Sequence, residues 1–382
     1  MLFNRMALIG FLSLLSCVFS FSGAWAQELV ESFNTPLPVI EEMDPAAFEQ
    51  ATTLYDEIPF GNELLSYSVR LPKEWKKDEK SGQISSSDSH LLAEIARYNG
   101  PVGLEARSRF TVDILDLKYQ VSAQQWILQH VLANGYNLQG IRVHNTRKVE
   151  VLLVTVEKDA SYIVRAVAQI NGKKMIFAQY AISDTNWATE QGMQAAAINS
   201  FALKTDKKEI IEDMLLFQFL DIAEFMYPAS WTLRAPPLNS IDRMSAKVSN
   251  MNEDQSVNGQ MEMDLVSSDV TKSLSDEIEN YKSAFSKKGL ILGEEIEKRD
   301  DFKFNENMEF AFLNVYAATD KESKMVDYEV WIAMMSANGF YYFVTLLTPA
   351  RNADFFVWSR NTETYRVVVE SVKPLEESLV ED

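Results

Sequence analysis

Histidine, the side chain that most often binds zinc or transfers protons in enzymes, is scarce in this sequence. His90, His130 and His144 are the only three, and no two of them lie four residues apart or within an H-E-x-x-H motif. The spacing therefore does not indicate a zinc hydrolase. His130 follows Trp126 and Ile127 at helical spacing, and we expect it to be a half-buried, hydrogen-bonded residue rather than a ligand.

Two aspartates, Asp113 and Asp116, are close enough in sequence to be considered as an acid–base pair. Because they lie three residues apart on a predicted strand, their side chains point to opposite faces, and we expect both to be solvated at the rim of the sheet. No G-x-S-x-G, G-x-x-x-x-G-K-[ST] or G-x-G-x-x-G motif occurs in the sequence. Serine-hydrolase, P-loop and dinucleotide-binding chemistry therefore lack their defining turns.

One stretch has the oxygen spacing of a calcium-binding EF-hand loop over its first nine positions: Asp254, Ser256, Asn258, Gly259 and Glu262. The twelfth position, which should be a bidentate Glu, is Leu265. The flanking residues alternate as strands do, so we interpret Asn258-Gly259 as a hairpin turn. We therefore predict no catalytic, cofactor-binding or metal-binding residue, no cofactor and no enzymatic activity.

The elements that must position any site occur twice. A strand ending at Pro72-Lys73-Glu74-Trp75 is repeated at Pro228-Ala229-Ser230-Trp231. Each corner is followed by a hairpin, a helix ending at Gly135 or Gly289, a run of strands containing Asn171-Gly172 or Asn338-Gly339, and a closing helix. An internal repeat of this length predicts two similar domains.

In the first copy, we predict a helix from Ser122 to Asn134, then strands at 138–144, 149–158, 162–170 and 174–182, and a closing helix at 187–203. In the second copy, we predict a hairpin at 245–266, a helix at 274–288, strands at 290–298, 308–318, 325–335 and 340–347, and a closing helix at 353–372. Meandering strands with helices laid on the sheet make each domain α+β, an antiparallel sheet flanked by helices.

The Pro-x-x-Trp corner and this order of elements resemble the PsbP-like α/β/α sandwich, whose bacterial envelope members include the DcrB-like proteins. The resemblance covers 64–203 and 215–373. It implies a non-enzymatic accessory or binding role in the assembly or stabilisation of a larger complex, and it assigns no functional residue.

The first residues have the features of an export signal. Arg5 precedes an apolar stretch, and Ala24-Trp25-Ala26 is a cleavage signal before Gln27, so we predict a signal peptide at 1–26 and a periplasmic protein. Cys17, the only cysteine, would leave with it, and the domains would then hold together without a disulfide. Lipidation at Cys17 and an uncleaved anchor are the alternatives.

Composition shifts suggest the remaining boundaries. We predict an acidic leader at 27–63, in which Asp44-Pro45 starts a short helix reaching Tyr55, a first domain at 64–203, a charged linker at 204–214, a second domain at 215–374 and an acidic tail at 375–382. The leader is interpreted either as a solvated spacer or as a partner-docking arm.

The chain has 55 acidic against 36 basic residues and a formal charge of −19. A field of this sign disfavours nucleic acid and anionic membrane surfaces as partners.

We therefore expect an exported accessory or assembly factor that acts by protein–protein contact in a cell-envelope complex of unknown identity. The expected contact surfaces are the leader, the interdomain cleft and the serine-rich loop at 81–89. The alternatives are a periplasmic small-ligand binding protein, in which aromatics of the second copy at the interdomain cleft stack on an apolar molecule, and an enzyme without a recognisable motif. The aromatics could instead fill a core, because they alternate at strand spacing.

Overall fold

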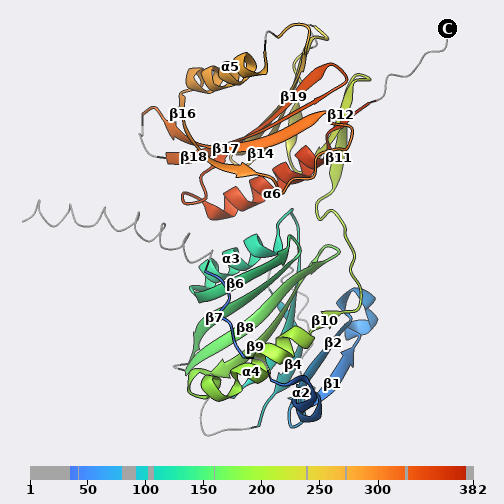
Figure 1. Cartoon of the computed structure of the whole chain (residues 1–382), viewed down its shortest axis with the longest axis vertical. Coiled ribbons are helices and arrows are strands. Elements are labelled where there is room, and N and C mark those ends of the chain that lie inside the picture. Colours follow the sequence, from blue (N-terminus) through green and yellow to red (C-terminus); the bar gives the residue numbers. More distant parts are fainter. Residues whose placement is uncertain are drawn as a thin grey trace, which may run out of the picture. The chain divides into compact units, whose positions relative to one another are not determined.

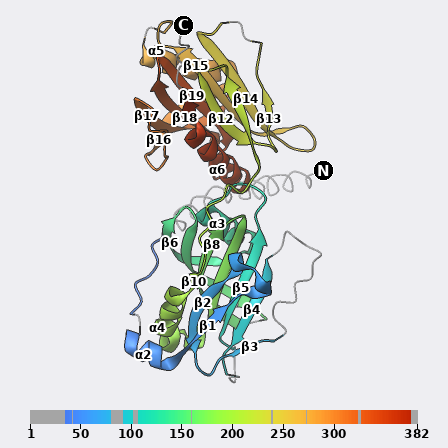
Figure 2. The same cartoon turned by 90° about the vertical axis from the view of Figure 1, so that its right-hand side faces the viewer.

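The computed structural model describes residues 35–41, 43–79, 92–101, 107–158, 160–237, 240–271, 273–322 and 326–375. The predicted signal peptide, the serine-rich loop, His90, Cys17 and all of the acidic tail beyond residue 375 lie outside these residues. The chain divides into two compact units, and the main division falls between Glu209 and Ile210, within the predicted linker. Each unit is described by itself (Figures 1 and 2).

The first unit contains a seven-stranded and a three-stranded antiparallel sheet. The large sheet has the order β3 (Lys76–Lys77), β4 (Ala93–Asn99), β5 (Arg109–Asp116), β9 (Lys174–Ser183), β8 (Ala160–Asn171), β7 (Lys148–Glu157) and β6 (Asn137–Asn145). The small sheet has the order β1 (Thr52–Glu57), β2 (Tyr67–Pro72) and β10 (Ala202–Leu203). The α-helices are α2 (Pro45–Ala51), α3 (Ala123–Asn134) and α4 (Asp184–Ser200).

The second unit repeats this topology strand for strand. Its large sheet has the order β13 (Thr232–Arg234), β14 (Arg243–Met251), β15 (Val257–Ser267), β19 (Phe340–Pro349), β18 (Val326–Ala337), β17 (Phe310–Asp320) and β16 (Leu290–Arg299). Its small sheet has the order β11 (Met214–Phe219), β12 (Ala223–Pro228) and β20 (Lys373–Pro374). Helices α5 (Leu274–Lys287) and α6 (Phe355–Ser371) lie on opposite faces of the large sheet (Figure 1). The predicted fold class, two similar α+β domains built on antiparallel sheets, is confirmed.

Local sequence signals explain where these elements begin and end. Ser122 caps α3 through the Gln125 amide, the Gln125 side chain returns the contact, and Gly135 ends the helix in the left-handed conformation, with φ 64°. Each Pro-x-x-Trp corner closes with a 3.0 Å hydrogen bond from the tryptophan amide to the proline carbonyl. Trp75 and Trp231 are both buried, so each corner fastens its strand to the core.

The pairing register aligns the two copies residue by residue. Asp113 in β5 pairs with Phe177, and Asp264 in β15 pairs with Phe343. Each of these phenylalanines is the fourth residue of its strand, β9 or β19. The same register corrects the predicted hairpin match by one position, because the turn of the first copy is Gly172-Lys173, whereas Asn338-Gly339 is itself the turn of the second copy.

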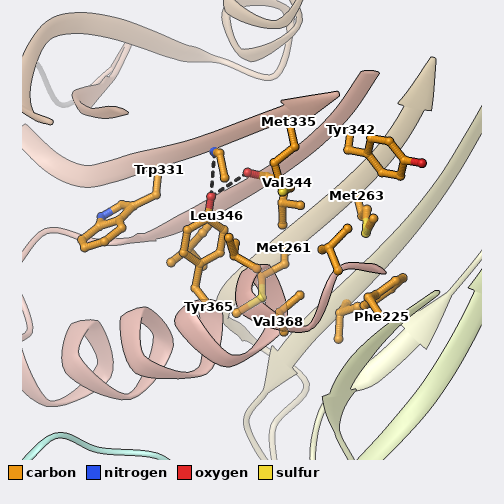
Figure 3. Packing of buried hydrophobic residues seen from close by; sticks show 14 of the residues in the cluster. Phe225, Met261, Met263, Trp331, Met335, Tyr342, Val344, Leu346, Tyr365 and Val368 are labelled. Atoms are coloured by element: carbon orange, nitrogen blue, oxygen red, sulfur yellow. Dashed lines mark hydrogen bonds between the residues drawn. The ribbon is translucent and has the colours of Figure 1, made fainter. Parts of the chain in front are cut away.

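A polar side chain of each closing helix reaches through the apolar layer to the two central strands beneath it. In α4, the Gln194 amide donates to the carbonyls of Ile163 and Tyr180. In α6, the buried Tyr365 hydroxyl accepts from the Ala333 amide at 2.8 Å and donates to the Val344 carbonyl at 2.6 Å (Figure 3). These bonds fix the helix at one height on the sheet, within a core of aliphatic, methionine and aromatic side chains.

The predicted leader is part of the first domain over its described length, which contradicts the solvated-spacer interpretation. Asp44 caps α2 as predicted, but the helix ends at Ala51 instead of reaching Tyr55. Residues 52–57 form β1, which pairs along its whole length with β2, and Phe48 is buried in the core. The amide of Leu37 also bonds to the carbonyl of Ile141 on β6. Acidic composition hid this strand, in which Tyr55 packs against the core while Leu54 and Asp56 are exposed.

The predicted linker is also bonded to the first domain. The Lys204 amide donates to the carbonyl of Ser66, and the Lys207 amide donates to the Asn171 side chain at 2.8 Å. Met214 already begins β11. The free connection is thus shorter than 204–214.

The hairpin predicted at 245–266 exists, but Asn258-Gly259 is not its turn. The turn spans 252–256, and Gly259 pairs with Asn250 inside the ladder. A glycine is needed there because the buried Asn361 side chain of α6 lies against its backbone; a Cβ at Gly259 would stand 2.3 Å from Asn361 Nδ2. Asn361 uses this approach to bond Asn250, Thr348 and the Asn258 carbonyl.

Replacing Gly259 by Ala should therefore push Asn361 away and destabilise the protein by about 1–3 kcal/mol, the cost of buried polar groups that lose their partners. Asn361→Ala alone should cost a similar amount. The double variant should be more stable than the sum of the two single destabilisations predicts, because an alanine at 259 no longer clashes once the Asn361 side chain is removed. Urea unfolding of the four proteins measures this coupling, and additive effects would contradict the proposed contact.

Candidate functional site

An apolar groove lies in the second domain beside the edge strand β11. It has a volume of about 430 Å³ and is lined by Phe217, Gln218, Phe219, Leu220, Ala235, Pro236, Pro237, Ser240, Arg243, Met244 and Ser245. Strand β11 supplies one wall, and the segment that connects β13 to β14, with the start of β14, supplies the other. Phe217 and Phe219 are held by the core, since both rings pack on Phe225.

The surface around the groove is unusually apolar for this chain. Leu216, Leu220 and Ile241 are 58%, 51% and 58% exposed, and Leu215 is also exposed. Strand β11 contains no charged residue, although 24% of the whole chain is charged. Exposed apolar patches mark interaction sites in soluble proteins, and these residues lie on or next to segments that line the groove.

The same position in the first domain is polar. When the two copies are aligned on the strand pairing of their corner prolines, Tyr55 is equivalent to Phe217 and Glu57 is equivalent to Phe219. Glu57 forms a 2.6 Å ion pair with Lys77 and accepts a hydrogen bond from Tyr98. The two copies therefore share a backbone but differ in chemistry at this edge.

Arg243 separates the groove from a second, polar cavity of about 180 Å³ beneath α5. There the Tyr281 hydroxyl donates to the Asp264 carboxylate at 2.6 Å, and Arg243 donates to the buried Glu277 at 2.7 Å. Burial raises the pKa of Asp264 to about 6 and, together with the Asp264 charge, raises the pKa of Tyr281 well above its ordinary value. Burial opposes the ionised form of Glu277, but hydrogen bonds from Arg243 and Asn280 hold the pKa of Glu277 below its ordinary value. The network fastens α5 to the sheet and leaves a proton-binding carboxyl inside it.

Asp113, the counterpart of Asp264, was predicted to be solvated, and this prediction is wrong. Burial raises the pKa of Asp113 to about 6, and its carboxylate accepts from Gln179 at 2.9 Å. Asp116 is exposed at the end of β5 and pairs with Lys174, as expected of a rim residue. The two aspartates do not form a catalytic pair, since Asp113 is half-buried against Gln179 and Asp116 is paired with Lys174.

The histidines in the described part of the chain do not lie together in one site. His130 stacks on Trp126 with ring centroids 5.2 Å apart, bonds Asn134, and has its pKa lowered to about 4 by burial, so the expected half-buried residue is confirmed. His144 lies 3.5 Å from Glu150. Over the described ranges, no group of three or more His, Cys, Asp or Glu side chains could hold a metal ion. Asp254, the first position of the calcium-like loop, instead accepts from the amide and hydroxyl of Ser256 in the hairpin turn.

The aromatic strand residues of the second copy fill its two cores. Trp331 and Tyr342 are buried between the sheet and α6, and Phe343 is buried on the α5 side. Tyr281 packs on Phe343 with ring centroids 4.7 Å apart. Trp331, Tyr342 and Phe343 are therefore core residues.

The protein is thus a two-copy α+β protein with an apolar groove on its second copy. In the described part of the chain, no helix is both long and apolar enough to cross a membrane. No family model matches the sequence, and no curated protein matches it.

Several solved structures are similar to this chain. Cyanobacterial PsbP (CyanoP) from Synechocystis sp. PCC 6803 has 12% sequence identity and a TM-score of 0.30, over 44% of this chain and 98% of that chain. The Saccharomyces cerevisiae Ran-binding protein Mog1p has 8% identity and a TM-score of 0.29, over 40% and 96%. The type VI secretion immunity protein TplEi from Pseudomonas aeruginosa has 10% identity and a TM-score of 0.22, over 81% and 94%.

Sequence reasoning missed the groove and the Asp264–Tyr281 pair. An uncharged run from Met214 to Phe219, within an acidic chain, was the available signal for the first. The Asp264–Tyr281 contact joins a strand to a helix whose relative height the sequence does not specify. No periodicity in the sequence would have found it.

The pH dependence of stability tests the burial of Asp264. Its carboxyl binds a proton more tightly in the folded state, so this contribution is present at low pH and is lost as the pH rises from about 4 through about 6. Asp264→Asn keeps an acceptor for Tyr281 and should be more stable than the wild type by about 1–3 kcal/mol at pH 7. The difference should vanish near pH 4.

Urea unfolding between pH 4 and pH 8 measures this effect. Asp301 provides a control of opposite sign, because hydrogen bonds from Arg299 and Arg366 hold the pKa of Asp301 well below its ordinary value. Asp301→Asn should therefore be less stable than the wild type at pH 7. A constant difference between Asp264→Asn and the wild type at every pH would show that Asp264 does not bind a proton in this range.

Proposed function

We propose that this chain is an exported, non-enzymatic accessory or assembly factor that acts by contact with a protein partner in the cell envelope. The observation that carries the proposal is the uncharged, exposed strand β11 beside an apolar groove. Exposing this much apolar surface is unfavourable in water, and covering it with a partner removes the cost.

The second domain is the contact domain in this proposal. Its groove is preformed, because Phe217 and Phe219 are fixed by packing on Phe225. The first domain supports the same backbone with tyrosines and ion pairs at this edge. A preformed apolar patch loses little conformational entropy on binding, which favours affinity.

Export is supported by Arg5, by the apolar stretch that follows it, and by the Ala24-Trp25-Ala26 cleavage signal. Partners with negatively charged surfaces are disfavoured by the charge of −19. The proposed partner is therefore a neutral or basic protein surface.

A second candidate function is the binding of a small apolar molecule in the same groove. Its volume of about 430 Å³ lies within the range of small-ligand sites. The two candidates differ in what the exposed leucines do, since Leu216 lies on the outer surface of β11 and does not line the groove.

Substitution of exposed residues tests the contact without disturbing the fold. Leu216→Lys should leave stability within about 0.5 kcal/mol of the wild type, because the side chain is mostly in solvent, and it places a positive charge against a neutral or basic partner. It should abolish crosslinking of the protein to its partner in the native envelope. Crosslinked products from a photoreactive residue at position 241 would be identified by mass spectrometry.

Leu54→Lys is the matched control, since Leu54 has the same register position in β1 and is 52% exposed. It should leave the crosslinked product unchanged. Equal crosslinking by Leu216→Lys and the wild type would overturn the proposed contact site. A thermal shift with an apolar small molecule, unaffected by Leu216→Lys, would favour the ligand-binding function.

A further inference from the structure

The hydrogen-bond pattern of β11 shows which of its backbone groups are unused. The Ala229 amide donates to the Asp213 carbonyl, so the pair formed by these two residues is a bonded pair of the antiparallel ladder. Bonded and non-bonded pairs alternate along such a ladder. The amides and carbonyls of Met214, Leu216 and Gln218 therefore point away from β12.

These groups face the open side of the small sheet. The sheet has the order β11-β12-β20, so β11 is its edge, and no other strand of the described chain pairs with it. Leu216 is 58% exposed. An edge of this length with unpaired backbone groups is a template for another strand.

The first domain has a charged residue at the corresponding edge, which disfavours pairing with another strand, and the second domain does not. In β1, Asp56 has the outward position that Gln218 has in β11, and it forms an ion pair with Lys204. Charged side chains on an edge strand discourage pairing with other chains. In β11, the outward positions are occupied by Met214, Leu216 and Gln218, which carry no charge.

The surroundings of β11 specify the side chains of an incoming strand. A strand added to this edge has alternate side chains on the groove side, where Pro236, Pro237 and Met244 offer apolar contacts. The intervening side chains point to the other face of the added strand, where the Glu224 carboxylate accepts a hydrogen bond from its ladder partner Gln218. This carboxylate and the negative charge of the chain favour basic residues at the intervening positions.

We propose that the partner contributes an extended segment of alternating apolar and basic residues, which adds to β11 as a further strand. The segment bonds to the backbone of Met214, Leu216 and Gln218 and places its apolar side chains in the groove. This inference rests on the proposed function and names the kind of partner that the same site accepts. Backbone pairing supplies affinity in this mode of recognition, and the groove supplies specificity.

A proline at position 216 tests the strand addition directly. Proline has no amide hydrogen, and the Leu216 amide points outward, so Leu216→Pro removes a bond to the incoming strand and spares the ladder to β12. Leu54→Pro makes the same change at the matched position of β1. Circular dichroism and thermal unfolding would establish that both variants remain folded.

The probe is a fluorescent synthetic peptide of alternating valine and lysine, and binding is measured by anisotropy. Leu216→Pro should weaken binding by about fivefold to tenfold, the loss expected for one backbone hydrogen bond. Leu54→Pro should bind as the wild type does. Peptides with N-methyl groups on one set of alternate residues should lose binding, and those methylated on the other set should retain it, whatever the fate of the protein variants. A peptide of alternating valine and glutamate should bind more weakly.

Equal binding of both N-methylated peptides would overturn strand addition, and so would unchanged binding by a folded Leu216→Pro variant. Equal binding of the valine–lysine and valine–glutamate peptides would overturn the charge preference. The proposed function fails separately, through the Leu216→Lys crosslinking experiment. Loss of crosslinking there, with no effect of Leu216→Pro on peptide binding, would retain a partner at the groove and exclude a paired strand.

Discussion

The bond between each closing helix and the two central strands beneath it determines how the rest of each domain is assembled. Tyr365 in α6 and Gln194 in α4 both reach backbone groups on neighbouring strands of the large sheet. A buried polar group without such partners would be costly, so the helix has one favourable height on the sheet. That height brings the strand after each helix, β20 or β10, alongside β12 or β2. The small sheet, and with it the edge strand β11, depends on this placement.

The two copies show how one topology supports different chemistry. In the first copy, Tyr55, Tyr98 and the Glu57–Lys77 pair occupy the region beside β1. In the second copy, phenylalanines and prolines occupy the region beside β11 and leave a groove. Half-buried aspartates are shared instead, since Asp113 and Asp264 have the same register position and both have a raised pKa. The shared aspartates lie on the large sheets, and the divergent features lie at an edge where another molecule can approach.

Most elements could be predicted because their signals are local. The Pro-x-x-Trp corners, the Ser122 cap with Gly135, and the meander of alternating strands each depend on residues that are near one another in sequence. Strand β1 was missed because its acidic residues hid its strand character. Gly259 was placed in a turn because Asn361, the residue that requires a glycine there, is far along the chain. The groove could not be predicted, since it forms only where β11 lies opposite Pro236 and Pro237. Distances between elements remote in sequence decide such sites, and a single sequence does not contain them.

The small sheets also bear on how the chain acquires its structure. In each copy, the middle strand of the small sheet, β2 or β12, pairs with the strand just before it and with a strand near the end of the same copy. Ser68 pairs with Ala202, and Glu224 pairs with Lys373. Closing these pairs requires long loops, which slows folding. The first copy can nevertheless complete its sheet before the second copy has left the ribosome. Because the beginning and end of each copy meet on one small sheet, a whole copy can be added in tandem through a short connection without opening the sheet of the other. This geometry provides a simple physical route by which one domain became two.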